Sequence, residues 1–217
     1  MAKKQAKKKA AGKKRGRKPT LASQADRYAL YQQAVQAPDF EVDFFIKAFR
    51  REYKRRPTIL REDFCGTHAV CCEWVKRRRD HVAIGVDIDP EPLNWGIQHN
   101  QSKLTEEQRS RIILQQADVR TSDGPKADVL AAENFSYWVF KTRPELREYF
   151  KIARRNLRKE GIMVLDLMGG PETMTENLQD VRRHRGFKYV WDQARLNPIN
   201  HDCTYHIHFR FPDGSEL

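Results

Sequence analysis

The sequence predicts an α/β fold, in which a doubly wound, mostly parallel sheet carries helices on both faces. Strand-like and helix-like patterns alternate from residue 58 to residue 170. The segment HVAIGVDID is apolar on both faces, as a strand inside a parallel sheet must be. Alternation of this kind gives parallel strands joined by right-handed crossovers. We therefore expect a parallel core, preceded by a helical cap and followed by an antiparallel strand pair.

Two helical segments form the expected cap, residues 19–56. The first, residues 23–36, begins at Ser23, a suitable N-cap, and ends before a proline. The second, residues 39–56, has an apolar stripe at helical spacing and also ends before a proline.

Five strands and three helices make up the expected core, residues 57–170. The strands are expected at residues 58–62, 81–89, 111–119, 127–134 and 162–170. The helices are expected at residues 69–79, 90–101 and 143–161. The first of these helices has a basic C-terminal end, which suits its dipole, the second opens with a proline, and Gly161 is expected to end the third.

The last part of the chain, residues 171–217, has a different pattern. Residues 171–186 predict a helix, and residues 187–195 and 203–211 predict two antiparallel strands. The tetrapeptide PDGS then signals a turn, after which a returning strand is expected. We expect this part to be a lid over the site, with the closing elements of the sheet missing from the chain. The alternative is that the strand pair itself closes the sheet beside residues 162–168.

Positive charge is concentrated at the N-terminus. The formal net charge is +12, and residues 1–18 contain ten Lys and Arg and no acid. This segment has too few apolar side chains to offset the entropy of ordering, so we expect a disordered tail. Such a tail gives weak, salt-sensitive contact with nucleic acid by counterion release. The alternative is a tail that only improves solubility.

Several classes of protein are disfavoured. No apolar run approaches the roughly 20 residues of a membrane span, and the N-terminus lacks the apolar core of a signal peptide. The four cysteines form no C-x-x-C pair, which argues against a zinc or thioredoxin-like site. We therefore expect a cytoplasmic protein with reduced thiols. The set that comes nearest to a metal site fits no zinc template: His201, Cys203, His206 and His208.

Acidic residues lie at or near the carboxyl end of each of the five predicted strands. Ligands of open α/β sheets bind at the carboxyl ends of the strands, so these side chains define the expected site. In chain order they are Glu62 and Asp63, Asp87 and Asp89, Asp118, Glu133 and Asp166.

The loop after the first strand favours a ligand without phosphate. A dinucleotide loop needs several glycines for close approach to pyrophosphate, whereas Phe64 and His68 stand here, and no Walker lysine is present. Acids at the strand ends repel phosphate. A ligand with a ribose and positive charge fits instead, and S-adenosylmethionine has both. Glu62 is then expected at its ammonium, Asp87 at its ribose hydroxyls and Asp118 at its adenine amino group.

These residues also carry a resemblance. The series Glu62-x-Phe64-x-Gly66-x-His68, GVDIDPEPL and QQADV resembles the motifs of class I S-adenosylmethionine-dependent methyltransferases, which have a Rossmann-like fold. The segments LREDFCGT, NFSYW and HIHFRFPDG resemble a bacterial family related in outline to glycine and sarcosine N-methyltransferases. The resemblance covers residue 26 to the end. It implies that the cofactor is held by Glu62, Phe64, Cys65, Gly66, Thr67, Asp87, Ile88, Asp118, Val119 and Asn134, with Asn134 near the methyl group.

The sequence does not identify a catalytic side chain or the methyl acceptor. A sulfonium is already an activated electrophile, so alignment and exclusion of water are the main requirements. We expect a small-molecule acceptor, because ENFSYW replaces the N-P-P-Y of enzymes that methylate base or glutamine amides. The alternatives are an RNA- or ribosome-associated methyltransferase targeted by the tail, and a non-catalytic cofactor-binding module. Candidates near the acceptor are His68, Tyr137, Trp138, the segment 134–136, and His206 and His208 in the lid.

Overall fold

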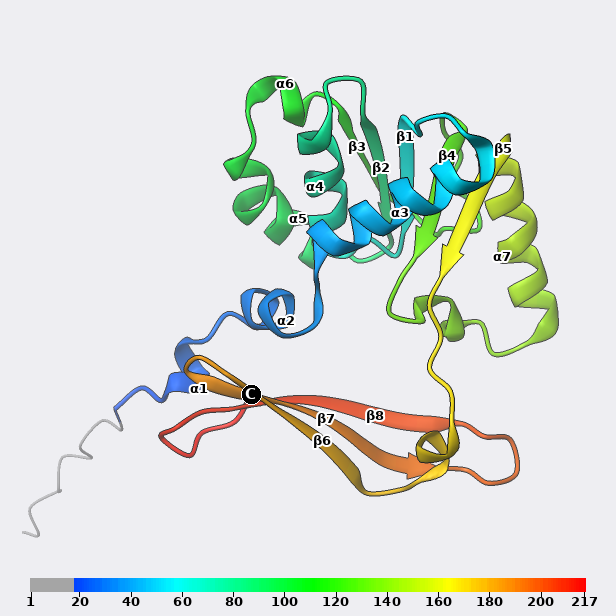
Figure 1. Ribbon diagram of the computed structural model, residues 1–217. Coiled ribbons are helices and arrows are strands. Elements are labelled where there is room, and N and C mark those ends of the chain that lie inside the picture. Colours follow the sequence, from blue (N-terminus) through cyan, green and yellow to red (C-terminus); the bar gives the residue numbers. More distant parts are fainter. Residues whose placement is uncertain (1–17) are drawn as a thin grey trace, which may run out of the picture.

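The computed structural model describes residues 18–217 and contains a parallel α/β core above a separate antiparallel sheet (Figure 1). The core sheet is fully parallel, in the order β3-β2-β1-β4-β5. The predicted doubly wound sheet is therefore confirmed. Its strands are β1 Ile59–Asp63, β2 Val82–Asp87, β3 Ile112–Gln116, β4 Ala127–Ala132 and β5 Leu157–Leu165. The predicted basic tail lies almost entirely outside the described residues.

Helices cover both faces of this sheet. On one face α3 and α4 bury Phe45, Phe49 and Trp74 against β1 and β4. On the other face α7 buries Tyr149 and Ala153 against β2 and β4. The helices of the core are α3 Pro38–Tyr53, α4 Ala69–Arg77, α5 Pro90–His99, α6 Glu106–Arg109 and α7 Arg143–Asn156, with short 3-10 turns η1 Gln101–Lys103, η2 Ser136–Val139 and η3 Pro171–Met174. Within the described residues no helix is long and apolar enough to cross a membrane.

The first helical segment divides into α1 Leu21–Gln24 and α2 Arg27–Val35. The expectation of one helix from Ser23 is wrong because Asp26 acts as an N-cap inside it. The Asp26 carboxylate accepts hydrogen bonds from the backbone of Tyr28 at 2.9 Å and of Ala29 at 3.2 Å. Its other oxygen accepts from Trp95 Nε1 at 2.6 Å, which fixes the start of α2 beside α5.

The helix α7 ends at Asn156, five residues before Gly161. Gly161 instead lies inside β5, where a Cβ would meet Leu157 Cδ2 at 2.9 Å and the Ala127 carbonyl oxygen at 3.2 Å. The pairing of β4 with β5 shifts register between Ala127 and Val129, at this same place. The predicted helix stop is therefore wrong, and the glycine serves close packing at a strand irregularity.

The C-terminal part forms a three-stranded antiparallel sheet in the order β6-β7-β8. The predicted strand pair is confirmed, but the helix expected over residues 171–186 is wrong, because residues 178–184 pair along β7. Gly186, with φ of 91°, makes the tight turn between the first two strands. None of these strands pairs with β5, so the alternative of a sheet closed by the pair is wrong. The strands are β6 Leu178–His184, β7 Phe187–Leu196 and β8 Cys203–Arg210.

The helix α2 connects the two sheets. Phe187, Tyr189 and Phe209 of the antiparallel sheet pack against one face of α2. The residues on that face are Leu30, Tyr31, Ala34 and Val35. The packing holds the antiparallel sheet below the carboxyl edge of the core, which is where a ligand is expected (Figure 1).

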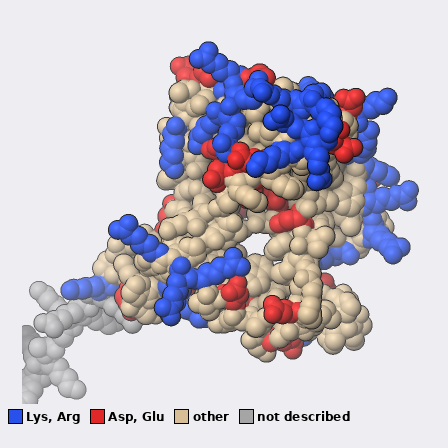
Figure 2. Space-filling model, viewed as in Figure 1, with Lys and Arg blue, Asp and Glu red and all other residues tan. Residues whose placement is uncertain are grey.

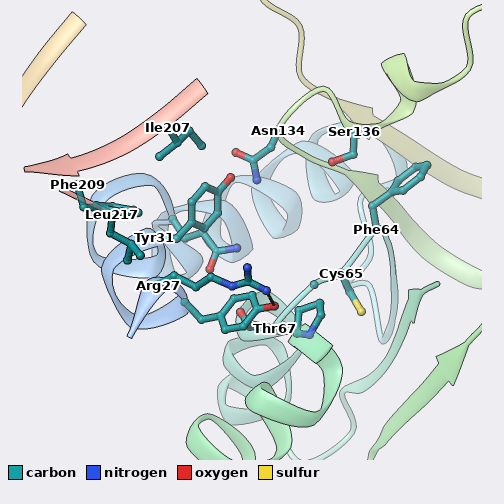
Figure 3. A pocket seen from close by; sticks show the side chains of 14 residues that line it. Arg27, Tyr31, Phe64, Cys65, Thr67, Asn134, Ser136, Ile207, Phe209 and Leu217 are labelled. Atoms are coloured by element: carbon teal, nitrogen blue, oxygen red, sulfur yellow. Dashed lines mark hydrogen bonds between the residues drawn. The ribbon is translucent and has the colours of Figure 1, made fainter. Parts of the chain in front are cut away.

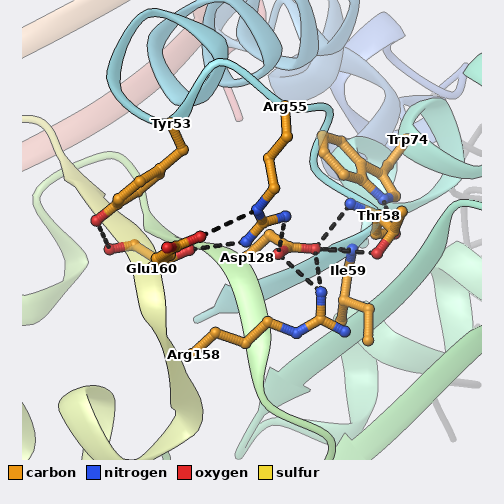
Figure 4. A network of polar contacts seen from close by, with 9 residues as sticks. Tyr53, Arg55, Thr58, Ile59, Trp74, Asp128, Arg158 and Glu160 are labelled. Carbon is orange, nitrogen blue, oxygen red and sulfur yellow. Dashed lines mark hydrogen bonds and ion pairs between the residues drawn. The ribbon is translucent and has the colours of Figure 1, made fainter.

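A buried carboxylate, Asp128, organises the amino edge of the core sheet (Figure 4). It accepts hydrogen bonds from the backbone of Thr58 at 2.8 Å and of Ile59 at 3.0 Å. It also pairs with Arg55 at 2.9 Å and with Arg158 at 2.8 Å. Burial by itself raises the pKa of Asp128, but the hydrogen bonds from Thr58, Ile59 and Arg55 outweigh it and hold the pKa below its ordinary value.

Replacing Asp128 by Asn should lower the free energy of unfolding by about 3 kcal/mol at neutral pH, because two guanidinium groups lose their buried partner. Since the folded pKa is depressed, this contribution is complete above the unfolded pKa of about 3.9 and is lost as the pH falls through the folded pKa. The difference between wild type and variant should therefore shrink in acid. Urea unfolding measured across this pH range tests both statements.

The matched control is Asp123→Asn, which removes an exposed ion pair to Arg155 at 3.5 Å. We expect its effect on unfolding to stay within about 0.5 kcal/mol. Equal effects of the two substitutions would show that Asp128 has no special role in the fold.

Candidate functional site

The loop between β1 and α4 has the backbone of a glycine-rich loop with only one glycine. Phe64, Gly66 and His68 have φ of 60°, 51° and 44°, all in the left-handed region. Glycine adopts this conformation without strain, whereas other residues pay about 1–2 kcal/mol each. The two departures from a glycine-rich motif therefore change the side chains and keep the path of the backbone.

The side chain of His68 turns away from the carboxyl edge and is fully buried beside α5. Only glycine fits opposite it: a Cβ at Gly96 would lie 2.3 Å from His68 Cε1 and 2.3 Å from the Thr67 carbonyl oxygen. Burial lowers the pKa of His68 to about 4, so the ring is neutral at physiological pH. His68 lines none of the cavities described below.

The aromatic ring of Phe64 packs on the opposite side of the loop. Its centroid lies 6.0 Å from that of Phe140 and 5.8 Å from that of Tyr149. These contacts are within the range of favourable aromatic pairs. Phe64 is thus half-buried in the core on the α7 face, and it also lines a cavity at the loop.

Asp87, at the end of β2, holds the loop in place. Its carboxylate accepts a hydrogen bond from the backbone of Gly66 at 2.7 Å and one from that of Asp89 at 3.0 Å. Each oxygen keeps a lone pair for a further donor. The next side chain, Ile88, is 67% exposed.

Asp118 follows β3 and pairs with Arg120, a neighbour that the sequence argument overlooked. The guanidinium approaches Asp118 at 2.6 Å, and the backbone of Arg120 donates at 2.8 Å. The hydrogen bonds from Arg120 hold the pKa of Asp118 below its ordinary value. The side chain of Val119 is buried. Asp87, Ile88, Asp118 and Val119 therefore lie along neighbouring strand ends, outside the lining of the cavities.

The carboxyl group of Glu62 is directed at α4. It accepts hydrogen bonds from the backbone of Cys71 at 3.2 Å and from its Sγ at 3.0 Å. Burial raises the pKa of Glu62 to about 8. Glu62 lines neither of the two cavities at the carboxyl edge, so it supports the helix behind the loop, and its expected contact with an ammonium stays a prediction.

A cavity of about 530 Å³, the loop cavity, opens in front of the β1–α4 loop (Figure 3). The loop itself, helix α2, the end of β4 and strand β8 form its walls. Four predicted site residues of the loop and Asn134 line it together. The other lining residues are Arg27, Tyr28, Tyr31, Gln36, Pro92, Ser136, Ile207, Phe209 and Leu217.

A second cavity of about 490 Å³, the sheet cavity, lies between α2 and the antiparallel sheet. It shares Tyr31, Asn134 and Ile207 with the loop cavity, so the two adjoin. Figure 3 shows these three side chains converging from α2, the β4 end and β8. The rest of its wall is mixed: it contains the aromatic residues Phe135, Tyr189 and Trp191 and the charged residues Glu172, Asp180 and Arg182.

Asn134 lies where the loop cavity and the sheet cavity adjoin, and Asp166 fixes its backbone there. Asn134 and Phe135 have φ of 56° and 44°, and their amides donate to the Asp166 carboxylate at 2.8 and 2.6 Å. Tyr137 is buried, and its hydroxyl donates to the Asp166 carbonyl oxygen at 3.0 Å. Asp166 and the segment after β4 therefore form one hydrogen-bonded corner.

The other predicted acceptor candidates lie on different sides of this corner. Trp138 packs on Phe135, with ring centroids 5.2 Å apart, and lines a third cavity of about 360 Å³ that shares Asn134 and Ser136 with the loop cavity. On β8, Ile207 and Phe209 face the loop cavity, whereas the intervening His208 points to the other face, near Asp192 at 3.4 Å. Across residues 18–217, no three His, Cys, Asp or Glu side chains are arranged to hold a metal ion.

Gly96→Ala should destabilise the protein, although alanine favours a helix by about 1 kcal/mol over glycine. The added Cβ would overlap His68 and the Thr67 carbonyl oxygen, and overpacking of this kind costs about 1–3 kcal/mol. We expect a lower melting temperature and weaker ligand binding at the loop. Gly124→Ala is the control, since its Cβ would meet nothing nearer than 3.5 Å. A Gly96→Ala variant as stable as wild type would contradict the close packing of loop and α5.

No protein-family model matches this sequence, and no curated protein matches it significantly. Solved structures are similar in fold. An S-adenosylmethionine-dependent methyltransferase from Clostridium acetobutylicum ATCC 824 aligns with a TM-score of 0.66 and 17% identity, over 88% of this chain and 76% of that one.

Two further structures are sugar-modifying enzymes. The sugar N-methyltransferase KedS8 from Streptoalloteichus sp ATCC 53650 aligns with a TM-score of 0.63 and 20% identity, over 96% of this chain and 81% of that one. The S-adenosylmethionine-bound amino pentose methyltransferase CalS10 from Micromonospora echinaspora aligns with a TM-score of 0.65 and 18% identity, over 88% and 78%. At these identities the comparisons establish that the chain has the fold of S-adenosylmethionine-dependent methyltransferases.

Proposed function

We propose that this protein is an S-adenosylmethionine-dependent methyltransferase that acts on a small molecule. The observation that carries the proposal is the meeting of two cavities at Tyr31, Asn134 and Ile207. One cavity adjoins the loop in which a methyltransferase fold holds its cofactor, and the other is free for an acceptor. Methyl transfer needs this arrangement, because donor and acceptor must meet in line in a site that excludes water.

The chemistry of the loop cavity suits the methionine end of the cofactor. Arg27 is the positively charged residue that lines this cavity, and its guanidinium is well matched to the carboxylate of the methionine end. Gln36 also lines it, and Gln36 Oε1 is a buried acceptor without a hydrogen-bond partner among the described residues. An ammonium group would satisfy this oxygen.

The strand ends suit the adenosine part. Asp87 retains lone pairs for the two ribose hydroxyls, and the exposed face of Ile88 offers an apolar surface to adenine. Asp118 and Val119 are proposed at the adenine edge, as expected from the sequence. Cofactor binding is thus divided between the loop cavity and the adjoining ends of β2 and β3.

The carboxylates around the corner make it favourable for positive charge. Burial raises the pKa of Glu133 to about 7, and the neighbouring Asp166 and Glu41 add to the effect. Glu133 Oε1 is buried and has no hydrogen-bond partner among residues 18–217. A cationic group placed at this corner would relieve the mutual repulsion of these acids.

The chain contributes alignment more than proton transfer. The bound cofactor supplies an electrophilic methyl group, and Asn134 and Tyr31 fix the geometry at the junction where the acceptor must enter. Burial raises the pKa of Tyr31 to about 12, so its hydroxyl stays neutral and donates or accepts hydrogen bonds. No general base is assigned, and none is needed for an acceptor that arrives deprotonated.

The sheet cavity supports a small acceptor. Its volume of about 490 Å³ is in the range of small-molecule sites, and its wall combines aromatic side chains with a few polar groups. KedS8 and CalS10, which share the fold, act on sugars. These observations favour a compact metabolite over a polymer.

The cofactor assignment is tested by calorimetry with S-adenosylmethionine and its demethylated product. Asp87→Ala should weaken binding by about 2–4 kcal/mol, because charge-assisted hydrogen bonds to the ribose are lost. Asp80→Ala is the control, since Asp80 is exposed and pairs with Arg78 at the opposite edge of the sheet. Unchanged affinity in Asp87→Ala, or tight binding of NAD, would refute the assignment.

The acceptor assignment is tested by transfer of a labelled methyl group to a panel of small amines and hydroxy compounds, with total RNA in parallel. For a small-molecule acceptor, Trp191→Ala should raise KM by about tenfold or more, because this ring lines the sheet cavity. Affinity for the cofactor should not change. Label found in RNA alone, or in no acceptor despite cofactor binding, would refute a small-molecule methyltransferase.

A further inference from the structure

Lys and Arg are concentrated at the amino edge of the core sheet, far from the cavities. Ten of the 41 Lys and Arg lie in residues 1–18, which leaves 31 against 29 acids for the rest of the chain. The segments 50–56, 76–80 and 154–160 alone hold thirteen of these cations and three acids. An almost neutral body therefore carries one strongly basic region.

The fold brings the three segments to one edge. They follow or include the C-terminal ends of α3, α4 and α7, and Figure 2 shows Lys and Arg gathered over the end of the molecule opposite the antiparallel sheet. Contacts connect them: Asp128 pairs with both Arg55 and Arg158, and the Thr58 carbonyl oxygen accepts from the backbone of Val82 at 2.9 Å. We name the Lys and Arg of these segments the amino-edge surface.

Ion pairs account for only part of this surface. Arg55, Arg77 and Arg158 have acidic partners, as do Lys76, Arg78 and Arg155. Seven other cations are exposed and have no acidic partner within 4.0 Å among residues 18–217. They are Arg50, Arg51, Lys54, Arg56, Arg79, Arg154 and Lys159.

The needs of the helices explain only four of these seven. Cations in the last turn of a helix stabilise its dipole, and Arg50, Arg51 and Arg154 lie there. Lys54 is the C-cap residue of α3, and its ammonium donates to the Arg51 carbonyl oxygen at 2.8 Å. Arg56, Arg79 and Lys159 come after the helices end, where the benefit has fallen away. Unpaired like charges at one edge destabilise a fold slightly, so an external anion is the simplest partner for them.

We propose that the amino-edge surface binds the phosphate backbone of nucleic acid, without reading its sequence. Arginine predominates there, and its guanidinium matches phosphate geometry. No large apolar side chain of these segments is strongly exposed, which disfavours insertion into a lipid bilayer and stacking on bases. Contacts of this kind go to phosphate and depend on salt through counterion release.

This binding leaves the cavities open. The surface lies at the amino edge and the loop cavity at the carboxyl edge, so nucleic acid bound there is a place of attachment and not the methyl acceptor. The ten cations of residues 1–18 add to the positive charge that attracts nucleic acid. The inference is independent of methyl transfer and holds for an active enzyme or an inactive one.

The test uses the full chain and a fluorescent duplex of arbitrary sequence, with binding followed by anisotropy over a range of salt concentrations. The variant is the triple substitution Arg56→Ser, Arg79→Ser and Lys159→Ser. The control is Arg183→Ser, Arg185→Ser and Lys188→Ser, which removes the same charge from exposed positions on the antiparallel sheet. Thermal unfolding of both confirms that they fold.

The amino-edge variant should bind about tenfold more weakly or worse, and its slope of log affinity against log salt should become shallower by about 2–3. The control should change affinity by less than about threefold, and a scrambled duplex should bind like the first. Equal losses in both variants would show that only net charge matters. No loss in the amino-edge variant would assign binding to the tail alone. Preferential binding of anionic phosphatidylserine vesicles, lost in the same variant, would favour a membrane. Each of these outcomes overturns the proposal.

Discussion

The pairing of Asp128 with three segments of the chain holds together the amino ends of the strands that carry the site. Its carboxylate binds the first residues of β1 and arginines on either side, so β1, β4 and β5 start at a common level. Past the register shift between Ala127 and Val129, Ala132 lies opposite Leu165 at the far end of the strands. Asp166 follows β5 there and accepts the amides of Asn134 and Phe135. Carboxylates thus tie neighbouring segments together at both edges of the sheet.

The loop after β1 shows how one backbone path is kept by different means. Glycines would adopt the left-handed conformation without strain, but Phe64 and His68 do so at some energetic expense. Burial of the His68 ring beside Gly96 and packing of the Phe64 ring on Tyr149 offset it. Asp87 then closes the loop onto β2. Side-chain packing here substitutes for the freedom of glycine, and the backbone presented to a ligand is preserved.

Much of the core was predictable from sequence because its signals are local. Apolar runs marked all five parallel strands, and the residues that follow them include Asp87 and Asp118, which the structure places at neighbouring strand ends. The strand β6 was not predicted, since LQDVRRH is mostly polar and becomes a strand only by pairing along β7. The end of α7 was also misplaced, because the chain from Leu157 onward pairs with β4, which is a separate segment of the sequence.

The sequence proposed residues mainly for the cofactor half of the candidate site. The loop and strand-end residues belong to contiguous motifs, whereas the sheet cavity is assembled from α2, the β4 end and the antiparallel sheet. Tyr31 lies in a predicted helix, but nothing local indicated that Trp191 would line the same cavity. Arg27 and Gln36 were missed for the same reason. The residues of the sheet cavity come from elements whose relative placement is a tertiary property, so the sequence suggested a reaction class but no substrate.

The two edges of the sheet carry opposite charge for different physical reasons. At the carboxyl edge, Glu133, Asp166 and Glu41 are partly buried around a corner that would stabilise a cation. At the amino edge, Asp128 neutralises only the two arginines that touch it, and the exposed cations beyond the helix ends stay in water. Burial makes the first charges selective for a small ligand, whereas exposure leaves the second screened by salt and suited to an extended polyanion. Because the two surfaces lie at opposite ends of the same strands, the proposed attachment at one would not obstruct the proposed chemistry at the other.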